Sequence, residues 1–448
     1  MTDESGSAEA GAASGSTEAD REARLAALLS VTIGSERDPD QDDVAETIGA
    51  GGSLDGPTGS SPTRRGGVSR GAWALLAVLV LAGGGLAYAG TRVLRSSTTG
   101  EVLAPVVDPA APGYEALVDP SPTIVVQHDV DGELDSLTVL SLASPEGAGG
   151  GGVLLVPTRT LADLPMLGET TVDTVYDPAR PQVQADAVGH LLGVGMQESA
   201  LVSDDRWADL VAPVSPITID NPNQILEDGV VRFEAGEIEL EPGDVGPYLR
   251  ATVEGESDLA RLFRHETFWT AWLDAVGADG SDAAVPGELD SGIGRFVRAL
   301  ARSEHDVETL PVEQGEPDDA GTEVVDLGDE PVFSPKSEQM RALVDRLVPL
   351  PLSPAPGERA RVRILNGTTD VAEAADVAGR LPPAGVSVSI VGNAPTLDVE
   401  ETTIEYAGEE FLDEAEAIAE ILGVGTVVED TRPSDAVDIT VTLGADHD

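Results

Sequence analysis

The longest apolar stretch of the chain runs from Ala72 to Gly90 and contains no charged side chain. At ~1.5 Å per residue, roughly 20 helical residues cross a ~30 Å hydrocarbon core. A helix satisfies its own backbone hydrogen bonds, so it can lie in lipid at little polar cost. The pattern predicts a transmembrane helix over residues 71–91. Three arginines precede this stretch and two follow it, which favours a cytoplasmic N-terminus and an extracytoplasmic body.

Two other interpretations of this stretch remain open. The small residues around Tyr88 fit a cleavage pattern, and Arg64-Arg65 fits a twin-arginine export signal. Against cleavage, the run is longer than a usual signal core, and ~70 residues precede it. The third interpretation is a buried globular helix. A membrane anchor and a cleaved signal would both place the body of the protein outside the cytoplasm, and we expect a single-pass protein of the cell membrane.

The region before the apolar run and the region after it differ in pattern. Residues 1–70 are rich in Gly, Ser, Ala, Asp and Glu, which is typical of a disordered cytoplasmic tail. From Thr123 to Leu142, alternating apolar positions predict two strands around a polar turn. A third strand is expected to end near Pro157. Apolar residues that recur every three or four positions predict helices over about 182–194, 258–276 and 292–303.

The last third of the chain reads as a linker followed by a small domain. Residues 306–358 are acidic and proline-rich, with one short helix expected over 337–347. Residues 360–446 alternate strand and helix patterns, which predicts a small α/β domain. The expected fold class is therefore α/β, with a mixed central sheet in the domain of residues 105–305 and a second α/β domain at the C-terminus.

Charge and composition exclude several function classes. The formal net charge is −55, from 81 acidic and 26 basic side chains, so binding to nucleic acid through phosphates is not expected. Repulsion of this size is best tolerated where salt screens it. The chain has no cysteine, which excludes disulfides, thiolate metal sites and cysteine nucleophiles.

The most distinctive polar pattern is the run DLARLFRH, which YLR precedes. Its charged residues Asp258, Arg261 and Arg264 recur every three positions and so lie along one side of a helix. An ordinary solvated face with an Asp–Arg pair explains that spacing. Arginines beside carboxylates are also how proteins hold a pyrophosphate, because guanidinium groups grip phosphate oxygens and carboxylates bind a hard divalent cation.

Histidines and tryptophans give weaker signals. The five histidines show no metal-ligand spacing and are expected on the surface, although His128 beside Asp129 could touch a bound phosphate. Trp207, Trp269 and Trp272 fit either helix-core packing or a sugar platform, and core packing is favoured.

These runs resemble the LytR-CpsA-Psr family. YLR with DLARLFRH resembles its late arginine motif, and HDVDGELDSLTVLSL resembles its first strands. VLLVPTRTLADLP is similar to its Pro-Arg-Asp strand, and AVGHLLGVG to its helix-to-glycine segment. The resemblance covers about residues 105–305. The segment from RVRILNGTTD to DITVTLGADHD resembles the LytR C-terminal domain found in actinobacterial members.

The resemblance implies a phosphotransferase that moves a glycopolymer from an undecaprenyl-pyrophosphate carrier to peptidoglycan. Matched position by position, it implies a Mg²⁺ site at Asp129 and Asp135. It implies catalytic roles for Arg250, Asp258, Arg261 and Arg264, with Asp258 bracing the arginines, and substrate contacts for Arg159 and His265. Phosphoryl transfer suits such a site, because it depends on positioning and charge neutralisation.

The chain departs from the family pattern at the arginines. Glu133 and Thr252 stand where the family has arginine, and His265 replaces a glutamine. Arg159 is displaced by one residue, which on a strand turns a side chain to the other face unless a bulge restores it. Two functions therefore stay open: a glycopolymer–peptidoglycan transferase, or a non-catalytic envelope protein that binds or scaffolds wall polymer. A transcriptional regulator would need a basic DNA-reading element, which the chain lacks.

Overall fold

The structure of the chain is a computed structural model, and it describes residues 106–145, 147, 150–227, 229–253, 256–315, 331–369 and 373–447. The predicted tail and the predicted membrane helix, residues 1–70 and 71–91, lie outside these residues. Within the described part of the chain, no helix is both long enough and apolar enough to cross a membrane.

A five-stranded mixed sheet forms the centre of the first domain, residues 119–348. Its order is β12 (His305–Thr309), β4 (Gly151–Val156), β3 (Glu133–Leu142), β2 (Thr123–Val130) and β7 (Glu198–Val202). Strand β3 pairs antiparallel with β2 and β4, whereas β7 and β12 add parallel strands at the two edges. The predicted strand pair over residues 123–142 and the predicted mixed sheet are confirmed.

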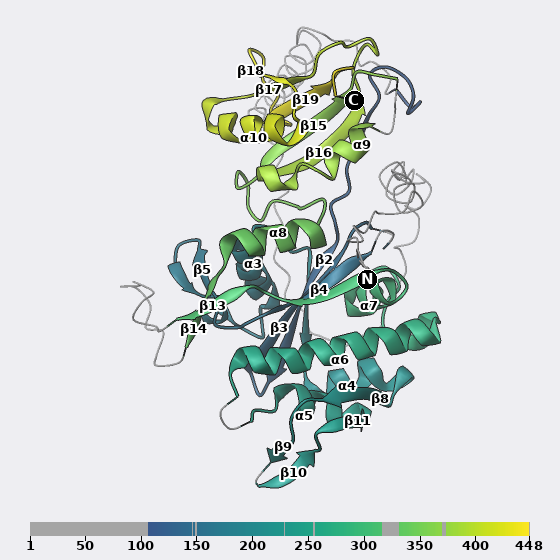
Figure 1. The fold of residues 1–448 in the computed structure, drawn as a ribbon, viewed down its shortest axis with the longest axis vertical. Helices are drawn as coiled ribbons and strands as arrows, with labels where there is room; N and C mark the ends of the chain where they lie inside the picture. The colour runs from purple at the N-terminus through teal and green to yellow at the C-terminus, as the bar shows by residue number, and fades with distance from the viewer. Residues whose placement is uncertain are drawn as a thin grey trace, which may run out of the picture. The chain divides into compact units, whose positions relative to one another are not determined.

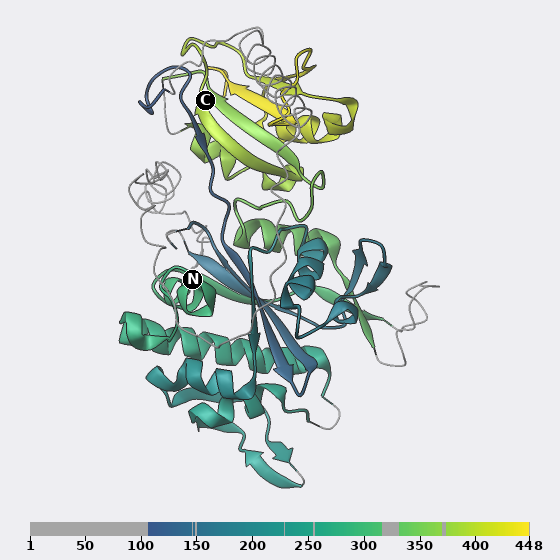
Figure 2. The ribbon, with the colours of Figure 1, turned by 180° about the vertical axis from the view of Figure 1, so that it is seen from behind.

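Helices cover both faces of this sheet (Figures 1 and 2). On β2, Ile124 and Val126 face one core while Val125 faces the other, as the period of two in a strand requires. The first core also contains residues of α4 (Asp204–Val211), α5 (Val245–Arg250), α6 (Asp258–Asp279) and α7 (Gly292–Ala301). The second contains residues of α3 (Pro181–Leu192) and α8 (Ser337–Leu347).

Four further strand pairs of the described residues lie around the central sheet and its helices. They are β5 (Leu161–Leu164) with β6 (Gly168–Thr171), β8 (Ile217–Asn221) with β11 (Gly236–Leu240), β9 (Ile225–Glu227) with β10 (Val230–Phe233), and β13 (Val312–Gly315) with β14 (Val332–Pro335). The stretch expected to be a linker, residues 306–358, thus contributes β12 to the central sheet and a further strand pair. Its acidic composition masks short apolar segments that the sheet buries, such as the one around Leu310.

The second domain is a six-stranded sheet with its own core. The order is β1 (Glu115–Leu117), β16 (Val386–Asn393), β15 (Ala360–Asn366), β19 (Ile439–Leu443), β17 (Thr403–Tyr406) and β18 (Thr426–Glu429), with helices α9 (Glu373–Ala378) and α10 (Leu412–Leu422). The alternation predicted for residues 360–446 is confirmed. The edge strand β1, which pairs antiparallel with β16, comes instead from a segment that precedes the first domain.

Candidate functional site: an arginine–carboxylate cluster

A β-bulge at the β2–β3 hairpin sets the position of the first two polar groups. His128 pairs with Ser136 and Asp129 pairs with Leu134, so Asp135 is an extra residue on β3. A bulge re-aims a side chain. Here it turns Asp135 to the face of His128, and Asp135 Oδ2 lies 3.2 Å from His128 Nδ1.

Buried His128 links two carboxylates. Its other ring nitrogen, Nε2, lies 2.9 Å from Asp204 Oδ1, and its ring packs edge-on against Trp207. Asp204 is the first residue of α4, whose preceding Ser203 accepts a hydrogen bond from the Arg206 N–H. Each ring nitrogen of His128 therefore faces the oxygen of a different carboxylate.

Two arginines complete the arrangement. Arg261, in the first turn of α6, donates from Nη1 to Asp135 Oδ1 (2.8 Å) and from Nη2 to the Asp135 carbonyl oxygen (2.9 Å). Arg250, the last residue of α5, donates from Nε to Asp204 Oδ2 (3.0 Å). We call Arg250, Asp204, His128, Asp135 and Arg261 the arginine–carboxylate cluster. It is a continuous chain of alternating basic and acidic groups.

Burial and charge act in opposite directions on Asp135. Burial alone would raise the pKa of its carboxyl group, but the hydrogen bond with His128 and the charge of Arg261 outweigh burial, so the pKa is lowered. Asp135 is thus ionised at neutral pH. Its carboxylate neutralises the Arg261 guanidinium inside the protein.

Arg264 lies on the same helix but outside this cluster. Its side chain is only 2% exposed, and its guanidinium pairs with Glu256 and donates to the carbonyl oxygens of Ala251 (2.6 Å) and Tyr248 (3.3 Å). Glu256 thus holds this arginine in place. Asp258, predicted to brace the arginines, is exposed at the first residue of α6.

The two predicted substrate contacts lie in different surroundings. His265 is buried and donates from Nε2 to the Leu249 carbonyl oxygen at 2.9 Å. Burial, with the nearby Arg261 charge, lowers the pKa of His265 to about 3, so the ring is neutral. Arg159 follows β4 and donates from Nε to the Pro331 carbonyl oxygen at 3.0 Å, beside β14.

The predicted Mg²⁺ ligands lie on opposite faces of the sheet. Asp129 accepts hydrogen bonds from the Tyr176 hydroxyl and from the Gly132 N–H, on the side of α3, whereas Asp135 faces α6. Among the described residues, no group of three or more His, Cys, Asp or Glu side chains has the geometry of a metal site. The residues as arranged do not fit a single cation held by both aspartates, and Mg²⁺ binding remains a prediction.

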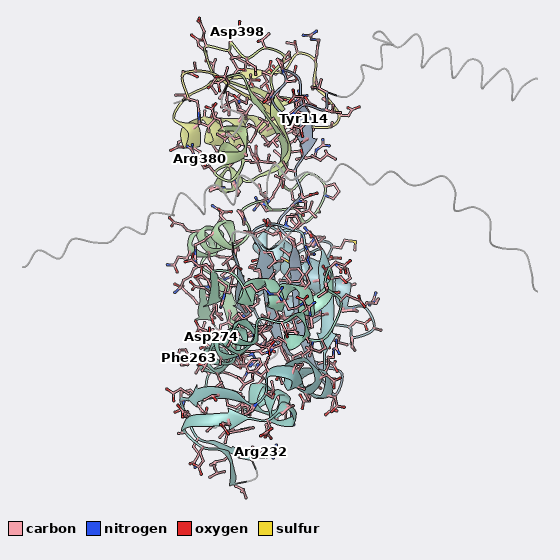
Figure 3. The ribbon with its side chains drawn as sticks, turned by 90° about the vertical axis from the view of Figure 1, so that its right-hand side faces the viewer. Tyr114, Arg232, Phe263, Asp274, Arg380 and Asp398 are labelled. Atoms are coloured by element: carbon pink, nitrogen blue, oxygen red, sulfur yellow. The ribbon has the colours of Figure 1, made fainter. Side chains whose placement is uncertain are left out.

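Aromatic rings fill the space between the sheet and the helices next to the cluster. Trp207, Phe268, Trp269 and Trp272 are at most 2% exposed and contact one another with ring centroids 5.3–6.2 Å apart. The prediction that these tryptophans pack in the core is confirmed. On the outer side of α6, Phe263 and Asp274 are exposed (Figure 3).

Two members of the cluster could not be predicted well from the sequence. His128 was expected on the surface and is instead buried, since the end of β2 packs against α4, whose Trp207 and Asp204 contact the ring. Asp204 looked like an ordinary acidic residue in the first turn of a helix. Only the structure shows its place, where Gly246 leaves room for it, because any Cβ at that position would clash with the Asp204 side chain.

Comparisons with known proteins give one family model and several solved structures to which the chain is similar. Residues 359–447 match the LytR_C family, described as LytR cell envelope-related transcriptional attenuator. No curated protein matches the sequence of the chain. Among solved structures, TagV of B. subtilis is 17% identical with a TM-score of 0.41, and the match covers 51% of this chain and 96% of TagV.

Two further solved structures are similar at the same level. The Lin1025 protein from Listeria innocua is 17% identical with a TM-score of 0.38, covering 51% of this chain and 98% of that one. The LytR-CPS2A-psr family protein YwtF (TagT), with bound octaprenyl pyrophosphate lipid, is 13% identical with a TM-score of 0.38, covering 55% and 92%. The chain thus carries a LytR C-terminal domain at residues 359–447, as its sequence predicted, and is similar to proteins of the LytR-CpsA-Psr family.

Proposed function

We propose that this protein acts in building the cell envelope, where it binds the phosphate-bearing end of a polyprenyl-linked glycopolymer destined for peptidoglycan. The LytR C-terminal domain and the arginine motif of residues 248–265 support this role. The proposal includes a membrane anchor at residues 71–91 and an extracytoplasmic body. We further propose that the protein binds or scaffolds the polymer rather than transferring it.

The observation that carries this distinction is the internal neutralisation of the arginines. Phosphoryl transfer needs cationic groups that stabilise charge on the phosphate oxygens. Arg261 instead uses both terminal nitrogens on Asp135, and Arg264 is buried against Glu256 and two carbonyl oxygens. Each charge-assisted bond contributes about 1.5–3 kcal/mol, so a phosphate would have to displace several bonds to recruit either arginine.

Arg250 is the residue through which the cluster can reach a ligand. Its side chain is 39% exposed, and its bond to Asp204 uses Nε rather than the two Nη nitrogens of the guanidinium fork. A fork of this kind binds two phosphate oxygens at once. We therefore place the polymer phosphate beside Arg250.

The lipid part of the carrier bears on the same distinction. A polyprenyl chain requires an apolar groove, whereas the space next to the cluster is packed with the four rings of Trp207, Phe268, Trp269 and Trp272. This packing favours recognition of the polymer head over uptake of its lipid.

A sedimentation assay with lipid-linked wall polymer tests the proposal. We expect the wild-type chain to bind the polymer and Arg250→Ala to weaken binding by about tenfold, since one charge-assisted fork is lost. Arg302→Ala is the matched control, because Arg302 is similarly exposed (47%) and pairs with a single carboxylate at the end of α7. Equal binding by both variants would contradict the assignment to Arg250.

A transferase is the second candidate. The observation that favours it is that Asp204, Arg250 and Arg261 meet in one partly exposed cluster, where an acceptor hydroxyl and a phosphate could be brought together. Covalent transfer to peptidoglycan, rather than binding alone, is what separates the two.

A further inference from the structure

One carboxylate of the cluster sits between two basic groups from different elements. Asp204 Oδ1 lies 2.9 Å from His128 Nε2 on β2, and Asp204 Oδ2 lies 3.0 Å from Arg250 Nε on α5. Each oxygen thus has its own basic partner. The two partners converge on a two-oxygen anion, which is the pattern with which proteins also bind two oxygens of a phosphate.

The position of Asp204 is built into the fold. Gly246 in α5 packs directly against it, and a Cβ on that glycine would clash with the Asp204 carboxylate and its Cα. The absence of a side chain at residue 246 therefore makes the space that Asp204 occupies. His128 is fixed from behind, because its other nitrogen contacts Asp135 and its ring packs on Trp207.

We propose that Asp204 occupies an anion subsite of this protein, where its carboxylate takes the place of two oxygens of a phosphate or pyrophosphate group. The inference rests on the proposed function, since it concerns the inner half of the site whose outer edge is Arg250. The internal carboxylate keeps this subsite closed to phosphate, because two anions cannot share the same pair of donors. Moving or removing it exposes His128 Nε2 and Arg250 Nε together.

Solvent can reach this subsite. The Asp204 side chain is 33% exposed, and Arg250 lies at its rim. A phosphate that replaces the carboxylate would keep both hydrogen-bond partners and gain contacts with the Nη nitrogens of Arg250. The ligand class is therefore a phosphomonoester or pyrophosphate, bound without its lipid.

Isothermal titration of the full chain with inorganic pyrophosphate, and separately with inorganic phosphate, tests the inference. We expect Asp204→Ala to bind pyrophosphate about tenfold tighter than the wild type or more, because a like charge is removed from within a few ångströms of the ligand. The neutral isostere Asp204→Asn should gain less, since its amide still fills the space. Asp205→Ala is the matched control: it removes the same charge from the adjacent, exposed residue of the same helix turn.

A second variant ties the gain to the proposed subsite. Asp204→Ala combined with Arg250→Ala should lose the gained affinity, and near-ultraviolet circular dichroism should show native packing of the tryptophans in every variant. Wild type, Asp204→Ala and Asp204→Asn binding pyrophosphate equally well would overturn the inference. So would an equal gain in Asp205→Ala, which would indicate a general charge effect.

The outcomes also separate this inference from the proposed function. If wild-type protein binds wall polymer but Asp204→Ala gains no pyrophosphate affinity, the inference alone fails. If Asp204→Ala gains affinity but no variant binds polymer, the anion subsite stands and the proposed function fails.

Discussion

Replacing Arg264 with methionine tests whether the motif arginines are held inside the protein. The substitution keeps an unbranched side chain in a site that is 2% exposed, but it removes the charge. It leaves the Glu256 carboxylate without its cation and the Ala251 carbonyl oxygen without its donor. It also removes the guanidinium that lies 5.7 Å from the centre of the Tyr248 ring.

The expected cost is large. Removing one partner of a buried ion pair costs about 3–5 kcal/mol, because the other charge stays buried and unpaired. In a domain of 150–250 residues, 1 kcal/mol corresponds to about 2–4 °C in melting temperature. We therefore expect Arg264→Met to lower the melting temperature of the first domain by roughly 6–20 °C.

Differential scanning calorimetry on the full chain measures this loss. The control is Arg302→Met, which removes the same charge from an exposed pair with Asp282 and should cost less than about 1 kcal/mol. In the double variant Arg264→Met/Glu256→Gln, part of the loss should be recovered, because the unpaired carboxylate is gone.

A small loss would refute the reasoning. If Arg264→Met costs no more than Arg302→Met and shows no coupling with Glu256, the Arg264 guanidinium is not committed to internal partners. It would then be available to a phosphate, and the case for a binding protein over a transferase would weaken.

Two further predictions concern the pairing of β1 with β16 in the second domain and the buried carboxyl group of Asp345 on α8. A Cβ on Gly392 would clash with the Tyr114 carbonyl oxygen, so Gly392→Ala should detach β1 from β16 and speed amide hydrogen exchange across β1 by about tenfold or more. The control Gly379→Ala should leave exchange unchanged, because the nearest atom to a Cβ there is 3.8 Å away. Equal exchange in both variants would count against the pairing of β1 with β16. Burial raises the pKa of the Asp345 carboxyl group despite the nearby charge of Arg359. The contribution of this group to stability is therefore full below the unfolded pKa of about 3.9 and is lost as the pH rises through the folded pKa. Asp345→Asn should melt at a higher temperature than wild type at pH 7 but not near pH 3, and a gain that does not change with pH would contradict this.

Local patterns predicted the regular elements well. The alternation of residues 123–142 corresponds to β2 and β3, the helix expected over 337–347 is α8, and the long amphipathic helix begins at Asp258 as expected. Each of these elements buries a face whose period is visible in the sequence. Elements that depend on distant partners were missed. Strand β1 is three residues long, and only its pairing with β16, more than 270 residues later, makes it a strand.

The candidate site was predicted only in part. Arg250, Arg261 and Asp135 do meet, but the sequence could not show what each arginine pairs with. Which carboxylate reaches Arg261 depends on the bulge at Asp135, and a one-residue irregularity leaves no mark in a hydrophobic pattern. Asp204 enters through the packing of α4 on α5, a contact between elements that no local pattern contains.

The most direct test of the central claim is a transfer assay with the full chain, a polyprenyl-pyrophosphate-linked glycopolymer, peptidoglycan and Mg²⁺. Product covalently attached to peptidoglycan and polymer bound to the protein are measured in the same reaction. The account predicts saturable binding that Arg250→Ala weakens, with no covalent product above the protein-free reaction. Product that accumulates with time and disappears in Arg250→Ala would contradict it and identify the protein as a transferase.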